Sequence, residues 1–289
     1  MGITLDMVWQ TLLRATPESL REGRLGLPDG GPTLVFDPVG RVHDTGIVPA
    51  HALELLRLYL PLKCRSGLRI AQIGQSLDGR IAADNGHSHF VTGPEDIRHL
   101  HRLRALVDAV IVGPGTVLAD DPQLTVRRVN GTNPVRVVLD PRGTVPADRQ
   151  VFRDRQSETL LLEGGEIRHD MPSHVRQLTL PVVDGVFAPQ AVVALLAQRG
   201  LHRLLIEGGG RTVSQFLAAG QLTDLSVTVA PMLIGSGIPA FTLPAIADLA
   251  KALRPPCRQF PLGEDRLYLF DLSHSTAAPG RLPNSTTRP

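Results

Sequence analysis

The sequence has few aromatic residues and almost no net charge. Its 289 residues include 8 Phe, 2 Tyr and 1 Trp, and 30 Lys and Arg stand against 28 Asp and Glu, a formal charge of +2. Nucleic-acid-binding surfaces combine clustered basic residues with stacking aromatic rings, and this sequence offers neither. We therefore expect no nucleic-acid partner.

Cysteine and long apolar runs are scarce as well. Cys64 and Cys257 stand far apart, in no Cys-x-x-Cys or Cys/His spacing, which favours two ordinary thiols in a reducing compartment over a disulfide or a zinc site. No apolar run is long enough to span a membrane, and Asp6 stands where a secretory leader has basic residues. These absences predict no membrane segment and a cytoplasmic location.

Residues 1–66 differ in pattern from the rest and are predicted to form an N-terminal extension of unknown role. Apolar residues recur at helical spacing in 6–15 and 49–62, and Gly and Pro frame a short strand pair within 28–42. A zinc deaminase needs a His-x-Glu and a Pro-Cys-x-x-Cys set, and neither occurs in this segment. We expect no deaminase chemistry from it.

Residues 67–272 alternate short Val/Ile/Leu runs with helical patterns, which indicates an α/β domain with a mostly parallel sheet covered by helices on both faces. The last two strands follow one another without a helix, which predicts an antiparallel edge. The expected β-rich runs are 68–74, 108–113, 134–140, 158–165, 177–183, 202–210, 225–235 and 266–272, and the expected helices are 94–107, 189–200 and 212–220. The Ser/Thr/Pro-rich tail, residues 273–289, is predicted to be disordered.

Three consecutive glycines, Gly208–Gly210, join a buried strand to a helix in "RLLIEGGGRTVSQFLAAG". Glycine lets backbone N–H groups approach a phosphate closely, and a helix N-terminus adds unsatisfied donors. Glu207, at the end of the strand, is expected to point into the crevice where ligands of such sheets bind. This junction is our first candidate phosphate site.

The stretch "GPGTVLADDPQLTVRR" carries two doubled charges, Asp120 with Asp121 and Arg127 with Arg128. We expect an extended chain here, in which neighbouring side chains point in opposite directions. One member of each pair would then face a ligand while the other is structural or solvated. No second carboxylate is in place for a glycosidase-type acid/base pair.

Four histidines, His87, His89, His99 and His101, lie close together in the sequence. Those in the helix stand at mixed spacings without acidic companions, so a surface histidine cluster is expected rather than a metal site. No Gly-x-Ser-x-Gly elbow supports a hydrolase.

Five segments in order, "SLDGRIA…NGHSHFVTG", "RLRALVDAVIVGPGTVLADDPQLTVR", "PVRVVLD", "LLIEGGG" and "VAPMLIGSG", resemble the C-terminal reductase domain of the bacterial riboflavin-biosynthesis deaminase/reductase. The resemblance spans about residues 67–272 and implies a dihydrofolate-reductase-like fold. It also implies a homodimer and NADPH-dependent reduction of the ribosyl group of a 5-amino-6-(5-phosphoribosylamino)uracil-type substrate to ribityl.

The resemblance implies site residues at matching positions. The substrate positions are Ser88, Arg104, Leu124, Arg127 and Glu207. The cofactor positions are Gly74, Phe90, Thr116, Asp120, Gly209, Gly210, Arg211, Thr212, Val213, Ser214 and Gln215. Glu207 and Asp78 are the candidates for proton handling and sugar orientation, and no metal is expected.

Two positions depart from the family pattern. Gln72 stands where the family has a lysine, and an amide can hydrogen-bond but supplies no charge. Pro141 stands where the family often has serine, although the adjacent Arg142 is suited to a cofactor 2′-phosphate. Two alternatives therefore stay open: a reductase of another pteridine- or folate-like substrate, and a catalytically degenerate paralogue that binds nucleotide.

Arg127 offers a direct test of the implied substrate site. A guanidinium holds a phosphate as a bidentate fork, so Arg127→Ala should raise the KM for a phosphorylated substrate steeply. Steady-state kinetics measure this, and unchanged kinetics would remove Arg127 from the site.

Overall fold

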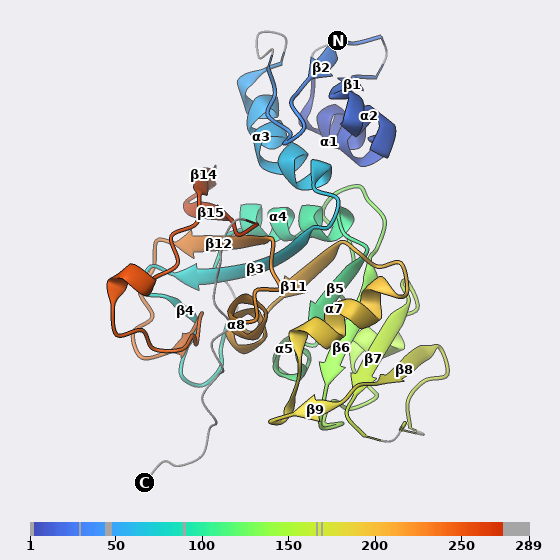
Figure 1. Ribbon diagram of the computed structural model, residues 1–289, viewed down its shortest axis with the longest axis vertical. Coiled ribbons are helices and arrows are strands. Elements are labelled where there is room, and N and C mark those ends of the chain that lie inside the picture. Colours follow the sequence, from blue (N-terminus) through green and yellow to red (C-terminus); the bar gives the residue numbers. More distant parts are fainter. Residues whose placement is uncertain are drawn as a thin grey trace. The chain divides into compact units, whose positions relative to one another are not determined.

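A computed structural model describes residues 3–28, 30–43, 48–88, 91–165, 167–168 and 170–273. The chain divides into two compact units, Met1–Leu68 and Arg69–Pro289 (Figure 1). The predicted tail lies outside the described residues except for Ser273. That residues 1–66 have a role of their own stays a prediction.

The first unit combines helices with a short hairpin. Its elements are α1 (Leu5–Arg14), α2 (Pro17–Glu22), β1 (Arg24–Gly26), β2 (Thr33–Val35) and α3 (Ala50–Cys64). Helices α1 and α3 pack through apolar side chains at helical spacing, and Trp9 meets Tyr59 edge-on with ring centroids 5.4 Å apart. The threonine hydroxyls of Thr4 and Thr16 cap α1 and α2.

The second unit is the α/β domain expected from the alternation of strands and helices. Its helices are α4 (Pro94–Ala105), α5 (Pro114–Asp120), α6 (Gln150–Arg153), α7 (Pro189–Ala197), α8 (Gly210–Ala218) and the 3₁₀ turn η1 (Leu249–Lys251). Its strands are β3 (Arg69–Ser76), β4 (Arg80–Ala82), β5 (Ala109–Val112), β6 (Val135–Asp140), β7 (Thr159–Glu163), β8 (Val175–Thr179), β9 (Val182–Val183), β10 (Val186–Phe187), β11 (Leu204–Glu207), β12 (Asp224–Ala230), β13 (Ile238–Pro239), β14 (Cys257–Leu262) and β15 (Asp265–Asp271).

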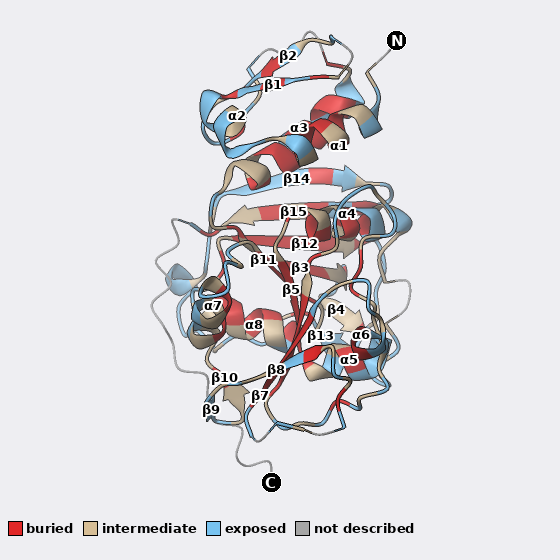
Figure 2. Ribbon diagram, turned by 90° about the vertical axis from the view of Figure 1, so that its right-hand side faces the viewer, coloured by how far each residue is buried: buried red, intermediate tan, exposed pale blue. Residues whose placement is uncertain are grey.

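One sheet of nine strands organises this unit, in the order β14-β15-β12-β3-β11-β5-β6-β7-β8. All neighbours from β12 to β8 pair in parallel, whereas β15 pairs antiparallel with both β12 and β14. The mostly parallel sheet with an antiparallel edge is thus confirmed, and β14 extends that edge by one strand that the sequence pattern did not reveal. Figure 2 shows how completely the central strands are buried.

Strand alternation separates the two faces of the sheet. Ala71 and Ile73 of β3, together with Ile206 of β11, join α7 and α8 in an apolar core. Gln72 of β3 and Glu207 of β11 face the other way and contact α4. Helices therefore cover both faces, and the face toward α4 contains buried polar side chains beside its apolar ones.

Two local expectations were wrong. The chain after β5 is not extended, because α5 begins at Pro114 and ends at Asp120, and Asp121 follows in the left-handed conformation with φ 42°. The expected surface histidine cluster fails at His99 and His101, which are 0% and 3% exposed. His99 faces the sheet and hydrogen-bonds Ser226 of β12, whereas His101, two residues on, points to another side of α4 and accepts from the backbone N–H of Arg127.

The described residues hold no group of three His, Cys, Asp or Glu side chains placed to bind a metal ion. Among the helices that the structure describes, none combines the length and apolarity needed to cross a bilayer.

Candidate active site

The candidate site forms where four neighbouring strands end. Strands β3, β11, β5 and β6 are parallel, so their carboxyl ends meet at one edge of the sheet. The loops that leave them carry the glycine run, the start of α5, the Asp140 turn and the Ser76–Gly79 turn. Segments far apart in the chain thus meet at the edge where ligands of parallel sheets bind.

Glycines at this edge let two helix starts approach each other. Gly208 has φ +78°, and a Cβ there would lie 2.6 Å from the Thr116 hydroxyl oxygen on α5. A Cβ at Gly113 would lie 2.5 Å from the Thr212 hydroxyl oxygen on α8. Side chains at either position would push α5 and α8 apart, so the glycines are required for the contact.

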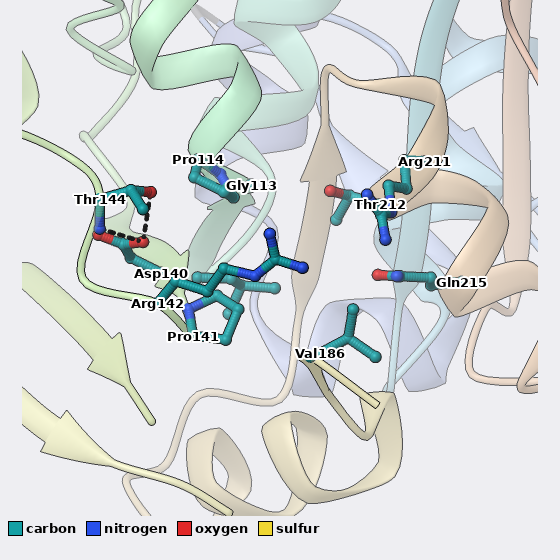
Figure 3. A pocket seen from close by; sticks show the side chains of 12 residues that line it. Gly113, Pro114, Asp140, Pro141, Arg142, Thr144, Val186, Arg211, Thr212 and Gln215 are labelled. Atoms are coloured by element: carbon teal, nitrogen blue, oxygen red, sulfur yellow. Dashed lines mark hydrogen bonds between the residues drawn. The ribbon is translucent and has the colours of Figure 1, made fainter. Parts of the chain in front are cut away.

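A cavity of about 180 Å³ opens beside these helix starts. Gly113 and Pro114 line it from α5, Leu139–Arg142 and Thr144 from the end of β6, Arg211, Thr212 and Gln215 from α8, and Gly185 and Val186 from the β9–β10 hairpin. Figure 3 shows Arg142 reaching across the cavity toward Thr212 and Gln215. Arg211 approaches from the α8 side, so two guanidinium groups border one small cavity.

The loop that carries Arg142 is held by a buried carboxylate. Asp140 is 0% exposed and accepts hydrogen bonds from the backbone N–H and the hydroxyl of Thr144 and from the N–H of Val145. Arg168 donates to the carbonyls of Gly143 and Val145 from the other side. These hydrogen bonds fix the backbone conformation of the loop that carries Arg142.

Arg104 and Glu207 form a buried ion pair at the neighbouring part of the edge. The Arg104 Nε donates to Glu207 Oε2 at 2.9 Å, and its Nη2 donates to Oε1. The remaining Nη1 donates to the carbonyl of Thr125 at 2.9 Å. One guanidinium on α4 thus ties the end of β11 to the segment after α5, and both predicted substrate residues lie side by side.

The segment after α5 turns sharply at two non-glycine residues, Asp121 with φ 42° and Leu124 with φ 57°. The two adjacent acids have different partners. Asp120 accepts a hydrogen bond from the Ser88 hydroxyl at 3.2 Å, whereas Asp121 accepts from the backbone N–H and the side-chain amide of Gln150. Asp121 therefore anchors the segment, and Asp120 contacts another predicted ligand residue.

Asp78 is exposed and holds a loop. Its carboxylate accepts from the Ser76 hydroxyl at 2.5 Å and from the backbone N–H groups of Ile234 and Gly235. These hydrogen bonds, the Ser76 bond first, lower the pKa of Asp78 to about 2. The group is therefore a carboxylate at neutral pH.

A buried polar cluster surrounds Gln72. Its Nε2 donates to Asp96 Oδ1 at 3.0 Å and to the Thr228 hydroxyl at 3.3 Å, while Thr92 and Thr228 both donate to Asp96. Burial is the main cause that raises the pKa of Asp96. Gly74 lies against this cluster, since a Cβ there would meet Thr92 at 2.8 Å.

The predicted cofactor residues are only partly gathered at the cavity. Arg142, Arg211, Thr212 and Gln215 line it, and Thr116, Gly209 and Gly210 belong to the adjoining helix starts. Val213 and Ser214 are 0% and 2% exposed, with Ser214 accepting from the Thr242 N–H, so their side chains face the interior. Phe90 lies outside the described residues.

Sequence reasoning missed the hairpin that forms one wall of the cavity. Asp184 and Gly185 have φ 53° and 76° between β9 and β10, and Gly185 lies against the Arg142 guanidinium. An Asp-Gly pair between apolar residues is a strong hairpin signal, and "VVDGVF" carried it. Asp96 and His101 gave no comparable signal, because their burial depends on how α4 packs.

The fold and this site define a class of protein. It is an α/β protein with a mostly parallel sheet and an antiparallel edge, and a glycine-lined cavity lies at the carboxyl edge of that sheet.

The sequence model of the RibD C-terminal domain matches residues 69–255, and the chain belongs to that family. A curated relative from Methanothermobacter thermautotrophicus, 2,5-diamino-6-ribosylamino-4(3H)-pyrimidinone 5′-phosphate reductase, is 37% identical over 212 residues, covering 70% of this chain and 96% of its own. The riboflavin biosynthesis protein RibD of Escherichia coli is 30% identical over 247 residues, covering 78% of this chain and 67% of its own. The first relative is named as a reductase and the second as a riboflavin biosynthesis protein.

Solved structures of proteins named for riboflavin biosynthesis share the fold of this chain. RibD of Acinetobacter baumannii superposes with a TM-score of 0.62 at 27% identity, over 76% of this chain and 63% of that one. The riboflavin biosynthesis reductase Rib7 of Saccharomyces cerevisiae has a TM-score of 0.58 at 22% identity, over 71% of this chain and 89% of its own, which shows the shared fold.

The Arg104–Glu207 pair predicts a large and specific effect on stability. Arg104→Met leaves Glu207 buried without its partner, so we expect a loss of about 3–5 kcal/mol in the free energy of unfolding. Replacing both residues, Arg104→Met with Glu207→Leu, should recover much of that loss because no lone charge remains. Urea denaturation of the wild type, the single variant and the double variant measures these free energies of unfolding.

Arg98→Met provides the control on the same helix. Arg98 pairs with Glu95 at 3.8 Å with both side chains more than 40% exposed, so its loss should change stability by less than about 1 kcal/mol. Equal losses for Arg98→Met and Arg104→Met would contradict a special role for the buried pair.

Proposed function

We propose that the chain is an NADPH-dependent reductase that converts the ribosyl group of a 5-phosphoribosylamino-pyrimidine to ribityl in riboflavin biosynthesis. The observation that carries the proposal is family membership over residues 69–255, together with a relative that is matched over 96% of its own length and is named as a reductase of a ribosylamino-pyrimidinone 5′-phosphate. The site geometry supports it from two sides, one suited to the cofactor and one to the substrate.

The cavity fits the phosphates of NADPH. Gly208 and Gly209 keep side chains out of the space before α8, where backbone N–H groups can donate to a phosphate. Arg142 and Arg211 place positive charge on two walls of the cavity, which suits the 2′-phosphate that distinguishes NADPH from NADH. When bound, NADPH supplies the hydride for the reduction.

The substrate side is built around the Arg104–Glu207 pair. Leu124 and Arg127 lie on the segment that Arg104 holds through Thr125, and Arg127 is exposed. Arg127 would hold the substrate phosphate as a fork. Leu124 is 0% exposed, so its side chain packs inside the protein and is not available to a ligand. Glu207, held by two hydrogen bonds from Arg104, serves as an oriented acceptor for sugar hydroxyls.

Asp78 is better suited to holding a loop than to handling protons. With a pKa of about 2 it has no proton to give at neutral pH, and three donors already engage it. We therefore assign sugar orientation to Glu207 and the positioning of the 232–235 loop to Asp78.

Two pyrimidines are candidate substrates. The Methanothermobacter relative is named for the 2,5-diamino-4(3H)-pyrimidinone compound, whereas a Thermotoga maritima deaminase/reductase structure, at 26% identity and TM-score 0.59, is named for the uracil.

The direct experiment measures NADPH oxidation by the purified full chain with each pyrimidine phosphate and with dihydrofolate. Turnover of either pyrimidine supports the proposal and identifies the substrate. Turnover of dihydrofolate alone would favour the folate-like reductase, and tight NADPH binding without turnover would favour a nucleotide-binding paralogue.

Cofactor choice is tested at Arg142. Arg142→Ala removes a charge-assisted contact to the 2′-phosphate, so the KM for NADPH should rise by roughly tenfold to a hundredfold while the KM for NADH changes little. Arg176→Ala is the control. This exposed arginine on β8 pairs with Glu158 and does not line the cavity. An equal effect on both nucleotides would remove Arg142 from 2′-phosphate recognition.

The homodimer implied by the resemblance and the cytoplasmic location expected from the sequence composition stay predictions. Support for a dimer comes from several large apolar side chains that are exposed on one stretch of the second unit: Met232, Leu233, Ile238, Leu243, Ile246, Leu249 and Leu253. Light scattering of the purified chain decides its oligomeric state.

A further inference from the structure

The backbone segment that carries Arg127 is not stabilised by secondary structure of its own. Asp121 and Leu124 both have positive φ, a conformation that costs a bulky residue about 1 kcal/mol or more and persists only when neighbours enforce it. Residues 121–128 contain no regular helix or strand, apart from the helix cap at Asp121. The direction of Arg127 therefore depends on contacts from other parts of the chain.

Hydrogen bonds from other elements hold the segment along its length. Gln150 donates to Asp121, Arg104 donates to the Thr125 carbonyl, and Asn133 accepts from the N–H of Val126 at 2.8 Å. The last contact is at Arg127 itself, whose backbone N–H donates to His101 Nδ1 at 3.0 Å. Among these anchors, His101 is the one that binds the residue carrying the guanidinium.

His101 is suited to this contact because its ring is a buried acceptor. It is 3% exposed, and Nδ1 must be unprotonated to accept the Arg127 N–H. Burial, followed by the positive charges of Arg104, Arg127 and Arg128, lowers the pKa of His101 to about 4. The ring is thus neutral around pH 7, and the acceptor is present where the enzyme would work.

The Arg127 side chain has a second attachment. Its Nη1 donates to the Thr125 hydroxyl at 2.6 Å, and Thr125 is fully buried. With the main chain held at His101 and the side chain held at Thr125, the guanidinium is restricted in the directions it can take before any ligand binds. A bidentate fork depends on that orientation, because both N–H groups must meet phosphate oxygens together.

We propose that His101 is a positioning residue for the substrate phosphate: its ring holds the backbone of Arg127 and so sets the direction in which that guanidinium is presented. The inference rests on the proposed function, since it takes Arg127 as the phosphate ligand. His101 acts through Arg127 and does not itself touch the substrate.

The test compares three replacements in the full chain. His101→Leu removes the acceptor and should raise the KM for the phosphorylated pyrimidine by about tenfold, with the KM for NADPH unchanged. His101→Asn places an amide oxygen near the position of Nδ1 and should recover most of the loss. His101→Gln carries its oxygen further from the main chain and should behave like the leucine variant, which keeps the test valid if His101→Leu fails to fold.

His99 supplies the matched control. It lies on the same helix, is 0% exposed, and hydrogen-bonds Ser226 through Nε2 at 3.0 Å, away from the Arg127 segment. His99→Leu should lower stability without a selective rise in the substrate KM. If both histidine variants raised that KM equally, the effect would be general loosening of α4 and the inference would be overturned.

A double replacement separates positioning from other roles. In an Arg127→Ala background, His101→Leu should add little to the KM, because the group it positions is gone. Additive effects would show that His101 acts independently of Arg127 and would overturn the inference. Hydrogen exchange at the Arg127 amide gives a readout without substrate, and we expect loss of protection in His101→Leu but not in His99→Leu.

Failure of the inference and failure of the proposed function look different. An active wild-type enzyme whose His101→Leu variant keeps the substrate KM and the Arg127 protection overturns the inference alone. A wild-type chain that turns over neither pyrimidine phosphate overturns the proposed function and, with it, the substrate role of His101.

Discussion

The buried ion pair between Arg104 and Glu207 is the contact on which the site depends. Arg104 uses two of its nitrogens on Glu207 and a third on the Thr125 carbonyl, so it joins α4, the end of β11 and the segment that carries Arg127. Burial makes each charge costly without the other, which makes the arrangement hard to deform. The pair therefore holds the segment that carries Arg127 to the centre of the sheet.

Helix α4, which carries Arg104, makes several polar contacts with the sheet. Asp96 meets Gln72 and Thr228, and His99 meets Ser226, in positions where most α/β proteins place aliphatic side chains. Hydrogen bonds have directions, whereas apolar contacts do not, so this layer specifies how α4 rotates about its axis. That rotation in turn decides where Arg104 and His101 point.

Much of the fold followed from the sequence because it depends on local patterns. Near-continuous apolar runs separated by helical spacing indicated a parallel sheet covered on both faces, and the missing helix before 266–272 indicated the antiparallel edge. The glycine run predicted a strand-to-helix junction with a phosphate site; the junction is confirmed, the phosphate site stays a prediction, and the contact of Gly208 with Thr116 was not foreseen. The segment after β5 misled us, since the apolar and charged residues there are compatible with both an extended chain and the short helix α5.

The sequence by itself determined the class of the fold, the order of its elements and the motif that places the chain in its family. Only the tertiary structure decided that Arg104 pairs with Glu207, that His101 holds Arg127, and that the β9–β10 hairpin closes the cavity around Arg142. Each of these contacts joins residues from separate elements. Hydrophobic period and turn chemistry are properties of neighbouring residues, whereas the partner of a buried polar group is chosen by packing across the whole domain.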